Sequence, residues 1–551
     1  MQADGDGEPL MGGSGGVMAL DQRFAGQTVA GVLEAQAAEN PDRVFLIAGD
    51  RRFTYAQVNA RSTALAAALT ELGVERGDRI AVDLPNWPEF VVSVFAAAKL
   101  GAVIVPLNPR YTVPELQYML RHSEATVVIS AEDFGGTDYL QLFEGFLTSL
   151  PELQYLVTVG EEDLWYDDRI YQFEDLVSSG ESGTEVTTPA IDPAQDTFAI
   201  LYTSGTMGKP KGVALTHENL VRTSALTVDA IALSADDVVF GVTTVFHVFG
   251  LGPGILGTAM AGASLVMQEQ FLPDEALHLI EQHRVTVHYG VPTVYVTEMR
   301  ELDVTEADVS SLRVGVVAGA PIGDEVVQRI RDALCPNLHV AYSLTETSST
   351  VAMTRPEDPL DKKLFTVGRP LPDAEIRVLD LDGTILPSES LGEIAVRGPG
   401  IMKGYYRQPG ETAQVFDEEG YFLTGDLGMI DEDGFVHIVG RRKELIIRGG
   451  FNVYPREVED RLHAHPAVLD VAVVGLPHDV LGEVVCACVV PVEGAIVTGE
   501  EIKEWCRGTL ADYKVPDLVR FFDSFPLTGS GKVRRVELAR MVSAEESSRR
   551  P

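Results

Sequence analysis

The strongest constraint on the fold is a short loop in which glycine, hydroxyl and lysine side chains are concentrated. Residues 202–213 read Tyr-Thr-Ser-Gly-Thr-Met-Gly-Lys-Pro-Lys-Gly-Val, and the apolar run Phe198–Tyr202 that leads into them is predicted to be a strand. Phosphate oxygens need hydroxyl and N–H donors, close backbone approach and positive charge, and this loop supplies all three. It is not a Walker A motif, because its Gly-Lys pair is not followed by Ser or Thr. The chain is therefore expected to bind phosphate at the end of a strand.

Two further predicted strands also end in small or polar residues. The strand Leu312–Ala318 leads into Gly319-Ala320-Pro321, and the strand His339–Tyr342 leads into Ser343-Leu-Thr345-Glu346-Thr347. Open α/β sheets bind ligands at the carboxyl ends of their strands, so the three clusters are expected to share one site in an α/β fold. The ring of Tyr342 beside a turn of small residues suits a purine, and Glu346 offers a carboxylate to Mg²⁺.

Length and pattern predict more than one domain. A chain of 551 residues is too long for a single hydrophobic core. After Arg441 the pattern changes to a smaller α+β unit, with strands expected at Val468–Val474 and Val484–Val490 and a helix at Ile502–Leu510. We expect a disordered leader over residues 1–20, a large N-terminal domain over 21–442 and a small C-terminal domain over 443–545.

Two other segments have clear local predictions. The apolar run Val91–Leu107 is interrupted by Lys99 and Gly101, so it is expected to form a buried helix and a core strand instead of a membrane span. The segments Leu427–Ile430 and Phe435–Val439 flank Asp-Glu-Asp-Gly, which predicts a β-hairpin.

The chain is strongly acidic and poor in lysine. It has 82 acidic and 43 basic residues and a formal net charge of −39, which argues against a nucleic-acid partner. Dispersed acidic charge predicts a cytosol rich in salt, where self-repulsion is screened. The four cysteines have neither zinc-type spacing nor a disulfide pattern, so reduced thiols in a cytoplasm are expected. A homodimer is compatible with these features.

Further motifs follow these clusters along the chain. They are Phe246-His247-Val-Phe249-Gly250, Thr424-Gly425-Asp426, the segment 440–455 that begins with Gly-Arg-Arg-Lys, and Leu527-Thr528-Gly529-Ser530-Gly531-Lys532. In their order and content these motifs resemble those of the adenylate-forming superfamily, from about residue 25 to residue 540 of this chain. The resemblance is closest to fatty-acid and related acyl-CoA synthetases. It implies a large α/β domain of stacked sheets flanked by helices, and a small mobile α+β domain.

The resemblance implies a two-step reaction and a role for each motif. ATP converts a carboxylic acid into an acyl-adenylate with release of pyrophosphate, and the thiol of coenzyme A then displaces AMP. The implied catalytic residues are Lys532, Thr206, Glu346 and His247, with Glu346 and Thr206 as Mg²⁺ ligands and Lys443 as the hinge of the small domain. The implied nucleotide and coenzyme A contacts are Thr203, Ser204, Gly205, Thr206, Gly208, Lys209, Lys211, Gly319, Ala320, Pro321, Tyr342, Ser343, Thr345, Asp426, Arg441, Gly449, Gly450 and Lys532.

Four positions depart from the family pattern. Met207 stands where a second Thr or Ser is usual, and Ser343 stands where Gly is usual. Ile447 and Gly449 stand where plant coumarate ligases and luciferases carry lysines, which favours bacterial or archaeal fatty-acyl and malonyl synthetases as the nearest type.

The substrate is predicted from the residues near His247. Amino-acid activators usually carry an aspartate at this position, so His247 disfavours an amino acid. The remaining pocket candidates are apolar and suit an acyl chain or an aryl ring; they are Val248, Phe249, Val291, Pro292 and the segment 315–319. A medium- or long-chain fatty acid is predicted. The alternatives are a branched, short-chain, aryl or dicarboxylic acid (Arg300 and Arg313 lie near in sequence), loading of a carrier-protein phosphopantetheine, and a non-catalytic nucleotide sensor.

A second glycine pattern is interpreted as a decoy. The segment Gly252-Pro253-Gly254-Ile-Leu-Gly257 matches the dinucleotide-binding pattern G-x-G-x-x-G, with Asp274 about twenty residues further on. Pro253 removes an N–H that pyrophosphate would use, and no βαβ pattern surrounds the segment. A nicotinamide-dependent oxidoreductase is therefore not expected.

Overall fold

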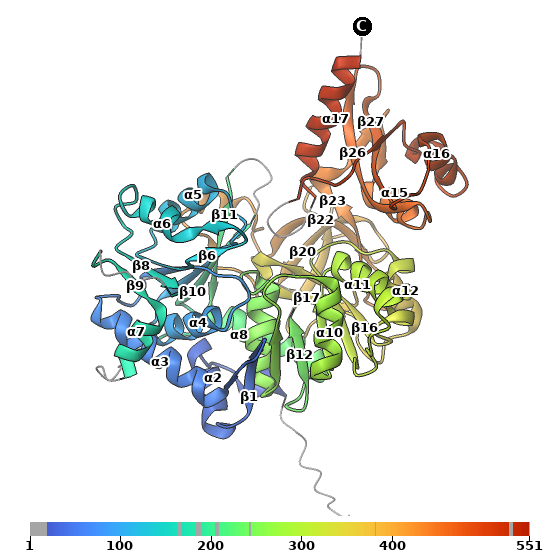
Figure 1. Cartoon of the computed structure of the whole chain (residues 1–551). Helices are drawn as coiled ribbons and strands as arrows, with labels where there is room; N and C mark the ends of the chain where they lie inside the picture. The colour runs from blue at the N-terminus through green and yellow to red at the C-terminus, as the bar shows by residue number, and fades with distance from the viewer. Residues whose placement is uncertain are drawn as a thin grey trace, which may run out of the picture.

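The computed structural model describes residues 19–161, 167–181, 189–203, 209–241, 244–380, 382–527 and 533–549. It has a large N-terminal domain of sheets covered by helices and a small C-terminal domain that stands apart from them, orange to red in Figure 1. The α/β fold class with a large and a small domain is thus confirmed.

One sheet of the large domain carries the strand that leads into the phosphate loop. Its eight strands have the order β21-β11-β10-β4-β3-β5-β8-β9, and those from β10 to β9 run parallel. The bounds are β3 Arg79–Asp83, β4 Val103–Pro106, β5 Val127–Ala131, β8 Tyr155–Val159, β9 Ile170–Gln172, β10 Thr197–Thr203, β11 Lys211–Thr216 and β21 Gly404–Tyr405. The strand predicted at 198–202 is confirmed as β10. A short hairpin of β6 Asp133–Phe134 and β7 Thr137–Asp138 lies beside this sheet.

The helices α1 Leu20–Arg23, α2 Val29–Glu39, α3 Tyr55–Glu71, α4 Pro88–Leu100, α5 Val113–Ser123, α6 Tyr139–Leu147 and α7 Phe173–Glu181 belong to the first part of the chain. Helix α4 is buried along its whole length and is followed by the core strand β4, as predicted for this apolar run. The buried ammonium of Lys99 in α4 donates hydrogen bonds to Glu34 Oε1 at 2.8 Å and to Asn59 Oδ1 at 2.9 Å, and the Glu34 carboxylate neutralises its charge. None of the helices in the described ranges has the length and apolar character that crossing a bilayer requires.

The second large sheet carries the other two clusters. Its order is β18-β17-β16-β15-β14-β12-β13-β1-β2, with a parallel centre from β16 to β1. The bounds are β1 Val44–Ala48, β2 Arg51–Thr54, β12 Val238–Gly241, β13 Ser264–Met267, β14 Val287–Gly290, β15 Val314–Val317, β16 Leu338–Leu344, β17 Ser349–Met353 and β18 Arg369–Pro370. The helices of this part are α8 His217–Ala230, the π-helix η1 Gly250–Gly257, α9 Thr258–Ala261, α10 Pro273–His283, α11 Pro292–Thr305, α12 Asp324–Ala333, the 3₁₀ turn η2 Thr345–Thr347 and α13 Leu360–Phe365.

The π-helix η1 explains the decoy glycine pattern. All of its residues are buried, and its glycines allow close packing. A Cβ on Gly257 would lie 2.5 Å from Val228 Cγ1 of α8, and a Cβ on Gly252 would lie 3.0 Å from Ser224 Oγ of the same helix. The glycines are therefore required by helix packing, and the segment is a helix in the core.

A four-stranded antiparallel sheet completes the large domain. It consists of β19 Glu375–Leu379, β20 Gly392–Arg397, β22 Phe422–Ile430 and β23 Val436–Arg441, and helix α14 Pro409–Ala413 precedes β22. Strands β22 and β23 form the predicted hairpin, in which Asp426 pairs with Arg441. This sheet lies below the small domain in Figure 1.

The small domain has its own sheet and its own cores. The 3₁₀ turn η3 Arg442–Glu444 leads into it, and its elements are β24 Ile446–Arg448, β25 Phe451–Val453, α15 Pro455–His463, β26 Val468–His478, β27 Gly482–Pro491, α16 Gly499–Arg507, the 3₁₀ turn η4 Asp512–Lys514, β28 Leu518–Phe521 and α17 Arg535–Arg549. The strands predicted at 468–474 and 484–490 are confirmed as parts of β26 and β27, and the helix predicted at 502–510 as α16. The two hydrophobic clusters on the faces of this sheet contain residues from Ile446 onward, and the clusters of the large domain contain earlier residues.

Candidate active site

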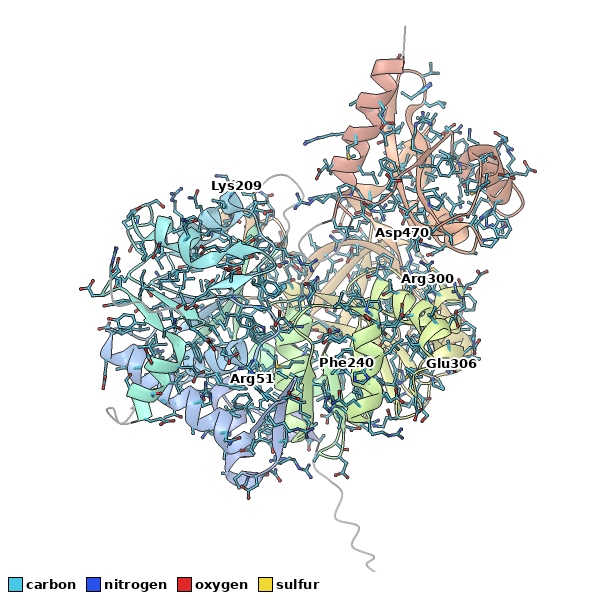
Figure 2. The ribbon with its side chains drawn as sticks, viewed as in Figure 1. Arg51, Lys209, Phe240, Arg300, Glu306 and Asp470 are labelled. Carbon is cyan, nitrogen blue, oxygen red and sulfur yellow. The ribbon has the colours of Figure 1, made fainter. Side chains whose placement is uncertain are left out.

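Two lysines lie at the C-terminal end of the phosphate loop, where β11 begins. Thr203 ends β10 and pairs with Lys211 at the start of β11, so the two ends of the loop are held together by the sheet. Lys211 forms an ion pair with Glu411, and its Nζ lies 4.6 Å from the ring centre of Tyr405. The Nζ of Lys209, labelled in Figure 2, lies 5.2 Å from the ring centre of Tyr118. Both ammonium groups are therefore held against aromatic faces beside the loop.

Several predicted contacts fall on segments that the structure does not describe. They are Ser204, Gly205, Thr206 and Gly208, together with Met207, in the phosphate loop, and Lys532 in the segment 528–532. Their roles stay predictions.

Glu346 is connected to the phosphate-loop side of the site by Tyr405. Tyr405 donates a 3.0 Å hydrogen bond to Glu346 Oε1, and burial together with this carboxylate raises the pKa of the Tyr405 phenol. The same ring contacts Lys211, so one tyrosine connects the candidate metal ligand with a lysine of the loop. Sequence analysis missed Tyr405, because its partners lie 59 and 194 positions away and no local pattern marks it.

The surroundings of Glu346 fit Mg²⁺ held by a bound nucleotide. Among the described residues, no group of three or more His, Cys, Asp or Glu side chains is placed to hold a metal alone. Mg²⁺ that acts on nucleotides is usually held by one or two carboxylates, phosphate oxygens and water, so the single carboxylate of Glu346 suffices.

Asp426 is held between a tyrosine and an arginine. Tyr342 at the end of β16 donates a 2.6 Å hydrogen bond to Asp426 Oδ2, and Arg441 Nε lies 2.9 Å from Asp426 Oδ1. Burial and the neighbouring Asp426 carboxylate hold the pKa of Tyr342 well above its usual range, so the phenol stays a donor. Asp426 in turn raises the pKa of Arg441. The structure thus brings together three predicted site residues from distant parts of the chain.

Two further carboxylates act on Arg441 over a longer range. The pKa of Arg441 is raised first by Asp426, and the negative charges of Glu444 and Glu346 raise it further. Asp426 is the carboxylate that contacts the guanidinium.

The small-residue turn and the histidine lie in connections that follow strands of the second sheet. Gly319 follows β15 with φ 86°, a conformation that favours glycine, and Ala320 and Pro321 are exposed. Ser343 and Thr345 are half-buried at the end of β16 and the start of η2. The half-buried His247 accepts a 3.5 Å hydrogen bond at Nδ1 from the N–H of Phe249.

The predicted coenzyme A contacts lie in the small domain. Gly449 and Gly450 form the two-residue turn between β24 and β25, with φ values of 59° and 87°. Two positive φ values at a two-residue hairpin turn are typical of type I′. The next residue, Phe451, is 57% exposed and stacks on Tyr513 of the same domain at 4.8 Å. The structure does not bring this turn into the group around Asp426.

Lys443 lies in the 3₁₀ turn η3 that joins the two domains. Its neighbour Arg442 contacts Glu393 of the large domain at 2.8 Å, and its other neighbour Glu444 contacts Arg535 of the small domain at 3.3 Å. Burial raises the pKa of Glu444. The chain thus changes its contacts from one domain to the other across Lys443.

Comparison with known proteins identifies the family to which this chain belongs. The model of the AMP-binding enzyme family matches residues 33–406, and the model of the AMP-binding enzyme C-terminal domain matches residues 457–532. The chain is 32% identical over 538 residues to medium-chain acyl-CoA ligase ACSF2, mitochondrial, of Homo sapiens, which covers 93% of this chain and 87% of that protein. It is 35% identical over 506 residues to feruloyl-CoA synthase of Amycolatopsis sp, which covers 92% of this chain and 97% of that protein.

Two solved structures of one protein, with and without bound ATP, are also similar to this chain. ATP-bound MatB from Rhodopseudomonas palustris has a TM-score of 0.83 at 31% identity, over 93% of this chain and 98% of that chain. Apo MatB from the same organism has a TM-score of 0.73 at 32% identity, over the same shares of the two chains.

Proposed function

Because this chain belongs to the AMP-binding enzyme family of the adenylate-forming superfamily and is an AMP-forming acid–CoA ligase, we propose that it activates a medium- or long-chain fatty acid. The observation that carries this proposal is the apolar character of the pocket candidates. Val248 and Phe249 are 1% and 3% exposed, and Phe249 packs on the ring of Tyr289 at 5.4 Å. Apolar side chains at these positions would favour an alkyl chain over a charged tail.

One of the two arginines that favoured a dicarboxylic acid is paired elsewhere. Arg313 binds Asp237 through two bonds of 2.6 Å, and it precedes β15, at the end of the sheet opposite the site. Arg300 lies on α11 below Asp470 of the small domain, as Figure 2 shows. The pairing of Arg313 supports a monocarboxylic acid. An aryl acid stays the second candidate, because feruloyl-CoA synthase is 35% identical to this chain.

We assign the nucleotide contacts as the motifs predict. Tyr342 and the turn Gly319–Pro321 would enclose adenine, while Asp426 and Arg441 would bind the ribose hydroxyls. The loop from Thr203 to Lys211 would bind the β- and γ-phosphates, and Ser343 and Thr345 would lie beside the nucleotide.

In the first step an oxygen of the substrate carboxylate attacks the α-phosphorus of ATP and pyrophosphate leaves. Lys532 would place its ammonium between the two reacting anions, which stabilises the charge that develops on the phosphoryl oxygens. Glu346 and Thr206 would hold Mg²⁺, whose charge neutralises the leaving pyrophosphate when it is bound. His247 would lie against the acyl end of the adenylate.

The second step requires the small domain to turn about Lys443, which we propose as the hinge between domains at 21–442 and 443–545. Thiolate attack on the acyl carbon then releases AMP, and Gly449 and Gly450 would allow the pantetheine arm to pass close to the backbone. The better match to ATP-bound than to apo MatB supports an adenylate-forming orientation in this structure. The four cysteines are buried free thiols, which supports a reducing, cytoplasmic location.

The test is pyrophosphate release over a panel of acids, with and without coenzyme A. The panel contains octanoate, palmitate, ferulate, malonate and an amino acid. Release with octanoate or palmitate and formation of the CoA thioester would support the proposal. Preference for ferulate would favour the aryl alternative, release without thioester would favour carrier loading, and no release with any acid would favour a nucleotide sensor.

A further inference from the structure

Arg456 of α15 contacts the large domain through two backbone carbonyls. Its Nη1 donates a 2.6 Å hydrogen bond to the carbonyl oxygen of Ile438 in β23, and its Nη2 donates a 3.0 Å bond to the carbonyl oxygen of Ile322, just before α12. Its Nε lies 3.4 Å from Asp460 one turn further along α15. We propose that Arg456 is a positioning residue that holds the small domain in the orientation that forms the acyl-adenylate, an inference that rests on the proposed function.

The geometry of the guanidinium makes these contacts specific for one orientation. Its donors are arranged in a rigid planar fork, and here they reach acceptors from two separate segments of the large domain. The side chain is 18% exposed, and Asp460 orients it from within its own helix. A small rotation of α15 therefore breaks one or both bonds.

Lys443 separates Arg456 from both of its acceptors along the chain. Ile322 and Ile438 precede the proposed hinge, while Arg456 follows it. When the small domain turns about Lys443 to bring in coenzyme A, Arg456 moves with it and the two carbonyls stay behind. The contact consequently stabilises only the first of the two orientations.

Two other approaches across this interface, both within the described residues, are longer or indirect. Arg534, two residues after Lys532, lies 3.7 Å from Glu115 of α5. A Cβ built on Gly323, the neighbour of Ile322, would lie 3.3 Å from Asp460 Oδ1, which places α15 close to the large domain. Among these contacts the two bonds of Arg456 have the shortest distances and the best-defined geometry.

The proposal predicts a difference between the two half-reactions. Arg456→Met keeps the stem and removes the donors. We expect ATP–pyrophosphate exchange to fall about tenfold, as the loss of charge-assisted hydrogen bonds implies, and thiolysis of supplied acyl-adenylate by coenzyme A to stay unchanged or rise. Arg456→Lys can reach one carbonyl and is expected to restore part of the exchange rate.

Arg461→Met is the matched control. Arg461 lies on the same helix, but its guanidinium stacks 4.1 Å from the ring centre of Trp505 and bonds to the Trp505 carbonyl, within the small domain. We expect this variant to leave the ratio of the two half-reactions at the wild-type value. An equal change of that ratio in both variants would contradict a specific role for Arg456.

The orientation itself can be measured without activity. The four native cysteines are buried, so spin labels can be placed on Val304→Cys of α11 and Ile496→Cys of the small domain, which are 77% and 97% exposed. We expect one dominant distance with the wild-type Arg456 and a second population with Arg456→Met. Unchanged distances would overturn the proposal, whereas absence of pyrophosphate release with any acid in the wild type would overturn the proposed function instead.

Discussion

The phenol of Tyr342 donates a 2.6 Å hydrogen bond to the carboxylate of Asp426, across 84 positions of the chain. This bond joins the carboxyl end of β16 in the second large sheet to β22 of the four-stranded sheet. It connects the group that would face adenine with the group that would bind the ribose, so the two recognition elements are not independent of one another.

Tyr342→Phe tests this connection. The change removes the donor and leaves Asp426 buried with Arg441 alone, and a hydrogen bond to a charged group contributes about 1.5–3 kcal/mol. We expect KM for ATP to rise about tenfold, measured by ATP–pyrophosphate exchange. Tyr421→Phe is the control, because Tyr421 makes the same type of bond to Glu375 on the exposed edge of the four-stranded sheet. An unchanged KM in Tyr342→Phe would show that Arg441 alone orients Asp426.

Lys532→Ala should separate the two half-reactions in the same direction as Arg456→Met, but more strongly. Removal of the ammonium leaves the α-phosphate and the substrate carboxylate without their proposed common partner. We expect adenylate formation to be abolished and thiolysis of supplied acyl-adenylate to be retained, each measured in single turnover. An equal loss of both activities would contradict the two-orientation mechanism.

Gly450→Ala should impair thiolysis. Gly450 has φ 87°, and no atom lies within 4 Å of the position that a Cβ would take, so the backbone conformation is the cause of the effect. The left-handed conformation costs an L-residue about 1–2 kcal/mol. If this cost of about 1–2 kcal/mol adds to the activation barrier of thiolysis, the rate of thioester formation falls about five- to thirtyfold. We expect ATP–pyrophosphate exchange to stay unchanged. Gly450→Asn, which tolerates this conformation, is the control and should lose less.

Asp83 should make stability depend on pH. It ends β3 and is 1% exposed, neither of its carboxylate oxygens has a hydrogen-bond partner among the residues that the structure describes, and burial raises its pKa to about 7. Between about pH 4 and 7 the folded state holds a proton that the unfolded chain has lost, so the free energy of unfolding falls as pH rises. Asp83→Asn should flatten this dependence by up to about 3 kcal/mol between pH 5 and 8.

Urea denaturation of both proteins at the two pH values measures this effect. The exposed Asp303→Asn is a control for loss of one negative charge. Parallel pH profiles for the wild type and Asp83→Asn would exclude Asp83 as the cause.

The acidic surface predicts dependence on salt. A net charge of −39 is self-repulsive, and raising the salt from 0.1 to 1 M shortens the Debye length from about 10 to about 3 Å. We expect Tm to rise by several degrees as KCl is raised to 2 M, measured by calorimetry, and to change less with sucrose at equal osmolality. Full stability at low salt would contradict adaptation to a salt-rich cytosol.

Local sequence patterns predicted the fold class and most elements near the site. Short apolar runs and one turn pattern predicted β10, β16 and the β22–β23 hairpin, because each depends on neighbours close in sequence.

The contacts that organise the site were not predictable in this way. Tyr405 contacts Glu346 and Lys211 because a short strand, β21, is added to the edge of β11, and nothing local identifies that pairing. The π-helix η1 was missed for the opposite reason. The spacing of its glycines matches a nucleotide-binding turn. That these glycines serve helix packing is evident only once α8 is seen beside them.

The separation of the hydrophobic clusters at Ile446 has an energetic consequence. Since no cluster is shared, turning the small domain need not open a core, and the balance between its two orientations rests on a few polar contacts such as those of Arg456. Under the proposed mechanism, a ligand that binds one orientation more tightly shifts this balance by its differential affinity, and a full reversal from 1:99 to 99:1 requires about 5.5 kcal/mol. We therefore expect the exchange of pyrophosphate for coenzyme A to set which orientation is populated.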